Sequence, residues 1–431
     1  MAHADAAAHP SAAILPGGFR ASTLRGAEGF FRAAQDGAGR WWLLDAAGQP
    51  FFCRAVHGVR ASATDGVAAA AGDPAPRLRQ WGFNAVGAGG DGAGRDDGLA
   101  FMATVDFCRA GALIHAPGVR LPDVFDPDWP QRAAERALEV CVPLATSREL
   151  IGWLADDLPG WAPAGTGAAP RPGLLQICLS LEPNFAAYHA AWEFALALHG
   201  GRLGALARAW GEPLANKEVV RELTRAERGL ASRGYLRDEA RWTREFARRY
   251  FTSTAAAMRA ADANHLLLGC RFGGPVGESV GAEGVYPAVD VPLLDWTELP
   301  PANAGAPGPI LAGDFCWADE KFINPAASSG PAPTAGSVRP GSPLAGLAHR
   351  LTAVERMLRR GRAALERAAR HPAVVGYVWR QWLDEPGEQP PFARGLVHQN
   401  GAGAREHTEL LAEFNVRAAA LRPTTTTSLS P

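Results

Sequence analysis

Short apolar runs that end in polar residues recur along the chain, and this recurrence constrains the fold more than any other feature of the sequence. Such runs are typical of strands buried on both faces of a sheet. Helical stretches lie between several of them, and this alternation favours a parallel α/β sheet or barrel. We expect strands at residues 52–59, 85–86, 112–115, 150–154, 266–268, 309–311 and 373–378.

Four longer stretches predict helices, at residues 129–144, 184–199, 237–261 and 344–370. In the third, aromatic residues recur at spacings close to 3.6, which indicates core contacts rather than ligand contacts. They are Trp242, Phe246, Tyr250 and Phe251. The many arginines of the fourth stretch predict a solvated helix face rather than a nucleic-acid contact.

The length and charge of the chain limit its class. A chain of 431 residues, 47% of them hydrophobic, can form one barrel or two or three smaller domains. We expect a single barrel domain over residues 21–421, with poorly ordered ends at 1–20 and 422–431. The 43 basic and 44 acidic residues give a formal charge of -1, so the sequence predicts neither a nucleic-acid nor a membrane partner. A neutral ligand fits this balance, and the oligomeric state is left open.

The cysteines and the N-terminal residues give further expectations. The six cysteines lie far apart without a CxxC pair, which predicts reduced core residues. The first residues have no basic and apolar segments of the secretory type, and no apolar run is long enough to cross a bilayer. On these grounds we expect a cytoplasmic protein. Two loops rich in proline, glycine and alanine are expected at the active face, at residues 159–170 and 324–340.

The run from His371 to Pro386 combines an apolar strand with polar and aromatic residues at its end. Indole faces bind the C–H faces of sugars, and amide and carboxylate groups bind sugar hydroxyls. The run therefore indicates a sugar-binding barrel mouth, and the alternative is a strand whose tryptophans fill a core. The candidate binding residues here are Trp379, Gln381, Trp382 and Asp384.

Other strand ends supply further candidates. Trp317 follows one strand, and Arg54 with His57 lies at the end of the first. Arg54 and Arg271 are candidates for binding an anionic sugar, or for a salt bridge to a barrel acid. His265 is expected to be structural. No group shows the ligand spacing of HExxH, and no GxSxG or Walker A motif is present. The glycine-rich segment Gly87–Gly92 is expected to be a loop rather than a GxGxxG turn between a strand and a helix. We therefore expect neither a metal nor a cofactor.

Several segments, taken in order, resemble bacterial beta-agarase-like glycoside hydrolases. The matches begin at Gly39–Phe52 and Trp81–Gly87 and end at His371–Pro386. Between them lie Leu121–Pro127, Ile151–Asp157 and the segment from Tyr250 to Phe272. The resemblance covers roughly residues 28–416 and implies a (β/α)8 TIM barrel with an N-terminal β-hairpin and long loops at the active face.

The two catalytic glutamates of that family are not matched in this sequence. Where the family has an Asp-Asn-Glu-like sequence, this chain reads Asp156-Asp157-Leu158. An ungapped register puts Leu158 at the acid position, and a shift of one residue puts Asp157 there. Asp314 stands where the family has its nucleophile. We expect Asp157 to act as general acid and Asp314 to act as nucleophile or base. Asp156, Trp161 and Glu320 are further candidate substrate-binding residues.

The shorter side chains bear on the stereochemistry of the expected reaction. Two carboxyl groups about 5–5.5 Å apart give retention, and a gap of about 6.5–9.5 Å gives inversion. Each Glu-to-Asp change retracts a carboxyl group by roughly 1 Å, which favours a wider gap. Glu320, six residues beyond Asp314, is the expected substitute nucleophile if Asp314 does not serve.

These observations predict a glycoside hydrolase that acts on a β-linked oligosaccharide or glycoside, of agarase or galactosidase type. The alternative is a barrel that binds carbohydrate without hydrolysing it, because the usual glutamates are missing. Either alternative has an oligosaccharide or glycoside as its ligand.

Overall fold

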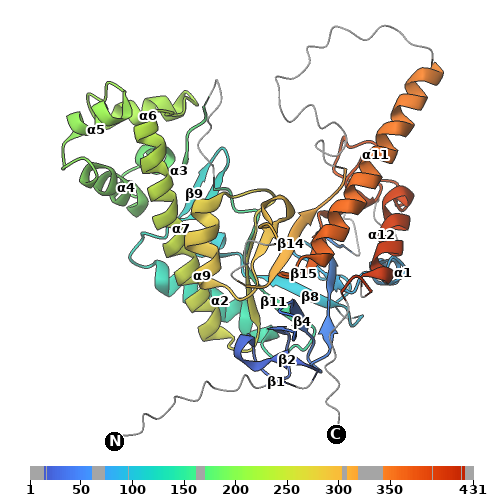
Figure 1. Ribbon diagram of the computed structural model, residues 1–431. Helices are drawn as coiled ribbons and strands as arrows, with labels where there is room; N and C mark the ends of the chain where they lie inside the picture. Colours follow the sequence, from blue (N-terminus) through green and yellow to red (C-terminus); the bar gives the residue numbers. More distant parts are fainter. Residues whose placement is uncertain are drawn as a thin grey trace, which may run out of the picture. The chain divides into compact units, whose positions relative to one another are not determined.

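Eight strands form one sheet in the order β12-β11-β8-β7-β6-β15-β14-β13 (Figure 1). Strand pairs such as β11–β12, β6–β7 and β14–β15 are parallel, and β12 and β13, at the two ends of this order, are in contact. The sheet is thus nearly closed, and with its surrounding helices it confirms the predicted (β/α)8 TIM barrel. The strands are β6 (Cys53–Val56), β7 (Ala85–Val86), β8 (Ala100–Thr104), β11 (Leu150–Asp157), β12 (Leu266–Arg271), β13 (Leu293–Asp295), β14 (Ile310–Phe315) and β15 (Val374–Trp379).

One predicted barrel strand was wrong. The run 112–115 forms β9 (Leu113–Ala116), which pairs antiparallel with β10 (Val119–Pro122) in a separate two-stranded sheet. Its side chains are only partly buried, as in a hairpin that faces water on one side. The barrel strand at this point is β8, which the sequence reading missed together with β13.

The computed structural model describes residues 14–15, 17–60, 73–95, 97–161, 170–302, 308–318, 343–390, 392–418 and 420–422. Contacts divide the chain into two compact units, one of residues 1–101 with 300–431 and one of residues 102–299. No helix in the described ranges is long and apolar enough to cross a membrane.

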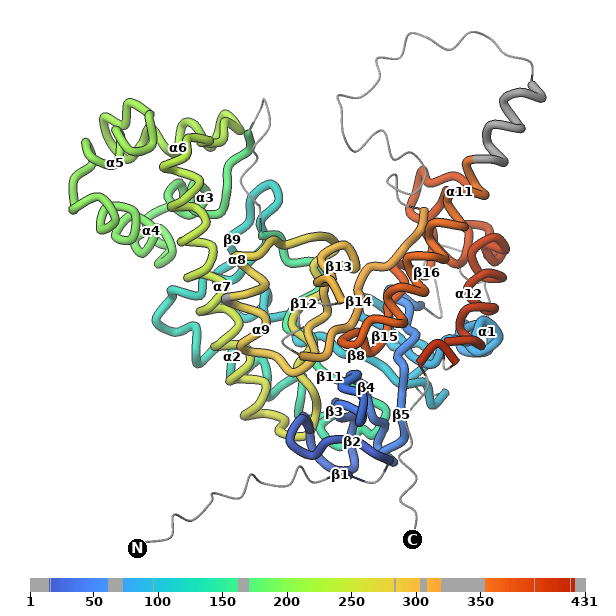
Figure 2. The backbone as a smooth tube through the Cα atoms, in the orientation of Figure 1, coloured from blue at the N-terminus to red at the C-terminus, as the bar shows by residue number. Residues whose placement is uncertain are grey.

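In the first unit the expected entry hairpin is part of a three-stranded antiparallel sheet, β3-β4-β5 (Figure 2). The Asp36 side chain organises its first turn, since it accepts hydrogen bonds from Ala38 N, Arg40 N and Trp42 Nε1. Helices α11 and α12 contact each other. Beyond the barrel strands this unit contains β1 (Ile14–Leu15), β2 (Phe19–Arg20), a 3-10 turn (Ala21–Thr23), β3 (Arg32–Gln35), β4 (Trp41–Leu44), β5 (Pro50–Phe51), α1 (Pro74–Gln80), α11 (Pro343–Arg370), β16 (Gln381–Leu383), β17 (Gly395–Val397) and α12 (Arg405–Arg417).

The second unit is largely helical, and α7 (Arg233–Ala261) is its longest helix (Figure 1). The aromatic residues predicted as core contacts of α7 are all buried, which confirms that reading. The other helices are α2 (Trp129–Cys141), α3 (Leu174–Ser180), α4 (Ala186–Ala197), α5 (Leu203–Trp210), α6 (Glu218–Arg225), α8 (Glu278–Val280) and α9 (Tyr286–Ala288). Short turns of 3-10 or π type lie at Phe107–Arg109, Val142–Leu144, Gly281–Val285 and Trp296–Glu298.

The remaining sequence-based predictions concern the cysteines, two loops and the chain ends. All six cysteines are free and buried, as expected. The two predicted loops lie mostly outside the described residues. Arg422, which we assigned to the tail, is buried instead, and its guanidinium donates to the carbonyl oxygens of Trp41, Ala369 and His371.

Candidate functional site

Asp156 is the next-to-last residue of strand β11, and its side chain is completely buried. Its Oδ1 accepts a hydrogen bond from Cys108 N at 3.0 Å, and the Tyr250 hydroxyl donates to its Oδ2. Burial raises the pKa of Asp156 to about 7, although the hydrogen bonds from Tyr250 and Cys108 act in the opposite direction. In this structure the Asp156 carboxyl group contacts Cys108 and Tyr250, and the substrate-binding role predicted for it stays a prediction.

The next residue, Asp157, is partly exposed and forms an ion pair with Arg271 of β12. Arg271 Nη1 lies 3.4 Å from Asp157 Oδ1, and the two residues are register partners of the two strands. The salt bridge that the sequence reading offered as one role of Arg271 is thus present. A neighbouring cation favours the ionised form of a carboxyl group.

Leu158 follows directly and leaves the strand with an unusual backbone. Its φ is +54°, and the side chain is 49% exposed. The Leu158 amide donates to Arg271 O at 2.7 Å, and the leucine side chain lies against Gly273. The position that an ungapped register assigns to the catalytic acid thus carries an exposed aliphatic side chain.

Three of the four non-glycine residues with positive φ in the described ranges lie within two residues of the carboxyl end of a barrel strand. They are Asp106, Leu158 and Asp314, with φ values of +59°, +54° and +47°. Such conformations cost roughly 1–3 kcal/mol each, and strain of this kind concentrates at functional sites. The carboxyl ends of the barrel strands are also where barrel enzymes carry their active sites.

Asp314 lies in β14 and is 5% exposed. The next side chain, Phe315, has aromatic neighbours, with ring centroids 6.1 Å from Trp317, 6.0 Å from Tyr377 and 6.2 Å from Trp379. The Asp314 side chain is itself almost completely shielded from water.

The candidate tryptophans have no exposed ring face in this structure. Trp317 and Trp379 are completely buried and Trp382 is 2% exposed. Trp317 Nε1 donates to His407 Nδ1, and Trp379 Nε1 donates to Arg394 O. Both contacts belong to a core, which is the alternative that the sequence reading left open for these side chains.

The polar candidates near them have protein partners. The Asp384 carboxylate accepts from Gly395 N and pairs with His398 Nδ1 at 2.7 Å, and Gln381 Nε2 donates to Glu388. Arg54 donates to Asn415 O, and burial lowers its pKa. The His57 ring is buried, and its Nδ1 accepts from Ala88 N at 3.0 Å.

The remaining candidates are Trp161, His265 and Glu320. Trp161 is 5% exposed, and its ring stacks on Phe251 at 5.9 Å. His265 has the structural role expected for it, with its two ring nitrogens 2.6 Å from Asp262 Oδ2 and 2.7 Å from Ser147 O. Glu320 lies outside the described residues. The substrate-binding roles predicted for Trp161, for Glu320 and for the preceding group stay predictions.

One group in the described ranges has the composition of a metal site. Ligand atoms of Asp106, Cys108 and Asp156 lie within 4.8 Å of one another. Asp106 already pairs with Arg109 at 2.7 Å and with Arg120 at 3.3 Å. Burial is the largest cause that raises the pKa of the Cys108 thiol, which disfavours the thiolate that a metal would need. We therefore assign no metal to this group.

Sequence reasoning missed the environment of Asp156. Tyr250 was taken only as one of the core aromatics of α7, and a helical pattern cannot tell a phenol that binds a carboxyl group from one that only fills space. Cys108 was likewise treated as one of six inert thiols. The charge pair of Asp157 with Arg271 was detectable, because both residues stand at strand ends.

Comparisons with known proteins identify the fold. No protein-family model matches the sequence, and no curated protein matches it. Among solved structures, an agarase, AgWH50C, matches with a TM-score of 0.60 and 19% identity over 95% of this chain and 68% of that one. An exo-beta-agarase matches at 0.58 and 18%, covering 94% and 67%, and PfGH50B at 0.63 and 17%, covering 95% and 69%. The chain therefore has the fold of the beta-agarase-like glycoside hydrolases.

Proposed function

We propose that this protein is a glycoside hydrolase that acts on a β-linked oligosaccharide or glycoside of the agar or galactan type. The observation that carries the proposal is Asp314, a buried carboxyl residue in a left-handed backbone conformation near the carboxyl end of a barrel strand. The likeness to agarases supports the same assignment through the fold. In this proposal Asp314 is the nucleophile, or the base that activates a water molecule.

The second carboxyl group of the proposal is Asp157. Its partial exposure allows contact with a ligand. In the acid role Asp157 carries a proton, so its ion pair with Arg271 must break when the substrate binds. An uncharged Asp157 then protonates the leaving oxygen. The carboxylate of Asp314 acts from the opposite face of the sugar ring, as nucleophile or as base for a water molecule.

The test is hydrolysis of aryl glycosides and of agar, galactan and glucan oligosaccharides, with product anomers followed by proton NMR. We expect Asp157→Asn and Asp314→Asn each to lower kcat by on the order of 10³-fold. The matched control is Asp128→Asn, an exposed acid of the same type. Unchanged turnover in either active-site variant would exclude that residue and make Glu320 the next to test.

A second candidate function is a barrel that binds carbohydrate without hydrolysing it. The exposed Leu158 favours this alternative, because in the ungapped register it occupies the acid position. This alternative predicts measurable sugar binding by the wild type without turnover of any substrate. It also predicts that Leu158→Glu introduces hydrolysis where the wild type has none.

A further inference from the structure

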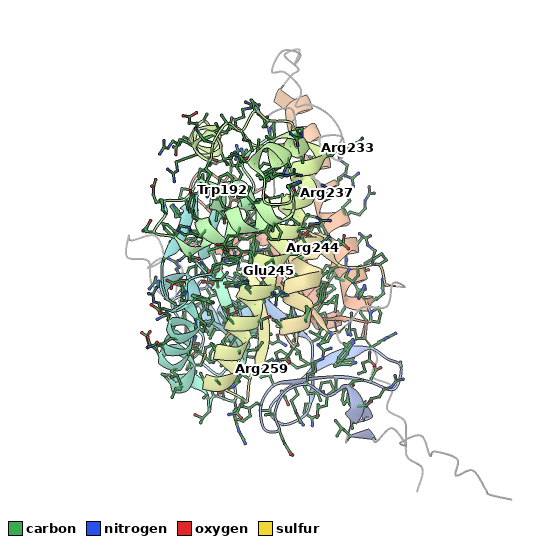
Figure 3. The ribbon with its side chains drawn as sticks, turned by 90° about the vertical axis from the view of Figure 1, so that its left-hand side faces the viewer. Trp192, Arg233, Arg237, Arg244, Glu245 and Arg259 are labelled. Atoms are coloured by element: carbon green, nitrogen blue, oxygen red, sulfur yellow. The ribbon has the colours of Figure 1, made fainter. Side chains whose placement is uncertain are left out.

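Five arginines form a stripe along one exposed face of α7, which we call the α7 arginine stripe. At 3.6 residues per turn they fall within an arc of about 80° and extend for about 22 Å along the helix. Figure 3 labels three of them, Arg233, Arg237 and Arg244, along the face of the helix turned to the viewer. The members are Arg233, Arg237, Arg241, Arg244 and Arg248, and all are exposed.

The acids of this part of α7 form ion pairs with only two of the five arginines of the stripe. Asp238 and Glu239 are buried, and Arg237 lies 3.6 Å from Asp238. Glu245 binds Arg248 at 2.8 Å and Arg249 at 2.6 Å. Within the ranges that the structure describes, no carboxylate forms an ion pair with Arg233, Arg241 or Arg244.

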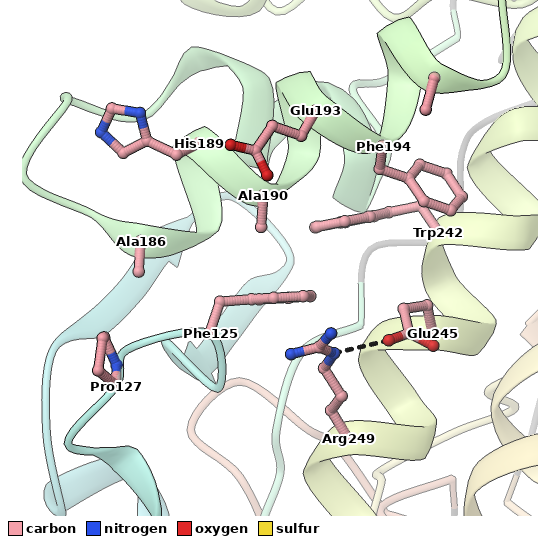
Figure 4. Close-up of a pocket in the computed structure, with 11 residues that line it drawn as sticks. Phe125, Pro127, Ala186, His189, Ala190, Glu193, Phe194, Trp242, Glu245 and Arg249 are labelled. Atoms are coloured by element: carbon pink, nitrogen blue, oxygen red, sulfur yellow. Dashed lines mark hydrogen bonds and ion pairs between the residues drawn. The ribbon is translucent and has the colours of Figure 1, made fainter.

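Two hollows adjoin the stripe. One, of about 380 Å³, has Phe194 and Leu198 beside three members of the stripe. The other, of about 640 Å³, lies between α4, α7 and the segment before α2, and Phe194 and Glu245 line both hollows (Figure 4). In the larger one, Phe125 is stacked on Trp242 at 4.8 Å and covered by the Arg249 guanidinium at 4.6 Å. His189 and Glu193 also line it.

We infer that the α7 arginine stripe and the adjoining hollows bind an anionic polysaccharide that carries sulfate or carboxylate groups. Guanidinium groups bind such anions bidentately, and a row of them suits a chain with charges at intervals. Apolar walls beside the row suit the C–H faces of sugar rings.

The surface is distinct from the residues proposed for catalysis, and only the choice of a polysaccharide draws on the proposed function. In this inference the α7 arginine stripe binds a charged polymer, and it takes no part in bond cleavage. Arginine supplies nearly all the positive charge of the chain, since Lys217 and Lys321 are its only lysines. A matched arginine control is therefore essential.

The experiment measures binding of a sulfated galactan, of neutral agarose and of a duplex DNA oligonucleotide by affinity electrophoresis at about 0.1 M salt. The test variant is Arg233→Gln/Arg241→Gln/Arg244→Gln. Its control is Arg359→Gln/Arg367→Gln/Arg370→Gln, which removes the same charge from exposed positions of α11. Hydrolysis of an uncharged aryl glycoside, measured in parallel, separates binding from turnover.

We expect the α7 variant to bind the sulfated galactan about tenfold more weakly than the wild type, with less than a twofold change in the control. Binding to neutral agarose should not change. Absence of binding to the sulfated galactan, equal losses in both variants, or DNA binding as tight as galactan binding would overturn the inference. A wild type that binds the galactan in this pattern but hydrolyses nothing would contradict the proposed function alone.

Discussion

Burial of the single residue Asp156 makes the stability of the fold depend on pH. Its ordinary pKa is 3.8, and burial raises the value in the folded protein to about 7. Below the ordinary value both states hold the proton. Between about pH 4 and 7 the folded protein retains a proton that the unfolded chain has released, so unfolding releases a proton. Stability must then fall as the pH rises through this window.

We expect the Asp156→Asn variant to lose this part of the pH dependence. One group contributes at most about 1.4 kcal/mol per pH unit to the slope of the unfolding free energy. Urea unfolding from pH 4.5 to 7.5, compared for the wild type, Asp156→Asn and Asp128→Asn, measures it. Only Asp156→Asn should flatten the dependence of the unfolding free energy on pH. A variant that keeps the slope of the wild type would show that Asp156 titrates normally.

The environments of single residues were also the hardest to predict from the sequence. Trp379 and Trp382 stand at a strand end in the pattern of a sugar platform, yet both are buried. Their burial depends on long-range contacts with Arg394 and Trp81, and no local pattern contains those. The acids at strand ends were identifiable because strand polarity alone places them there.

At the scale of elements, Glu239 of α7 stabilises the start of α3. Its carboxylate accepts from Leu174 N at 2.7 Å and from Leu175 N at 2.9 Å, and also from the Tyr235 hydroxyl. Helix α3 has no side-chain cap of its own. A Cβ atom at Gly173 would meet this carboxylate at 2.6–2.8 Å, which explains the glycine at that position.

We therefore expect Glu239→Ala to destabilise the protein by about 3 kcal/mol, because it leaves two buried amides without an acceptor. Hydrogen exchange should accelerate most at the amides of Leu174 and Leu175. Glu222→Ala on α6 serves as the control and should have little effect. Unaltered exchange at Leu174 in the Glu239 variant would show that another group caps α3.

Elements with continuous burial were the easiest to predict, with one instructive exception. The strands β11, β12 and β15 each contain a continuous buried apolar run and were found. Strand β8 is buried over its first four residues, but its Ala-Phe-Met-Ala-Thr sequence has only one β-branched residue, the threonine at its end. The β9 run has an isoleucine between a leucine and a histidine. It was predicted as a barrel strand in place of β8, but it forms a separate hairpin with β10.

At the scale of the whole molecule, the barrel followed from the alternation of elements, because parallel strands joined by helices have few alternative arrangements. The residue at which the folded domain ends could not be predicted from this alternation. Arg422 is followed by a run of proline, threonine and serine that looks like an unstructured tail. Its guanidinium is nevertheless buried over Trp42 and Phe52, with centroid distances of 4.9 Å and 5.3 Å.

Arg422 joins β4 to the segment around His371, which lie more than 300 residues apart in the sequence. Three carbonyl oxygens lose their donor if it is removed, and a chain ending at Leu421 should be less stable by about 3 kcal/mol. A chain ending at Arg422 is the matched control, since it lacks the same tail but keeps the guanidinium. Urea unfolding should separate the two truncated proteins and leave the longer one close to the wild type. Equal loss in both would assign the stabilisation to the tail beyond Arg422, and equal stability in all three would mean that the buried guanidinium contributes nothing net to the fold.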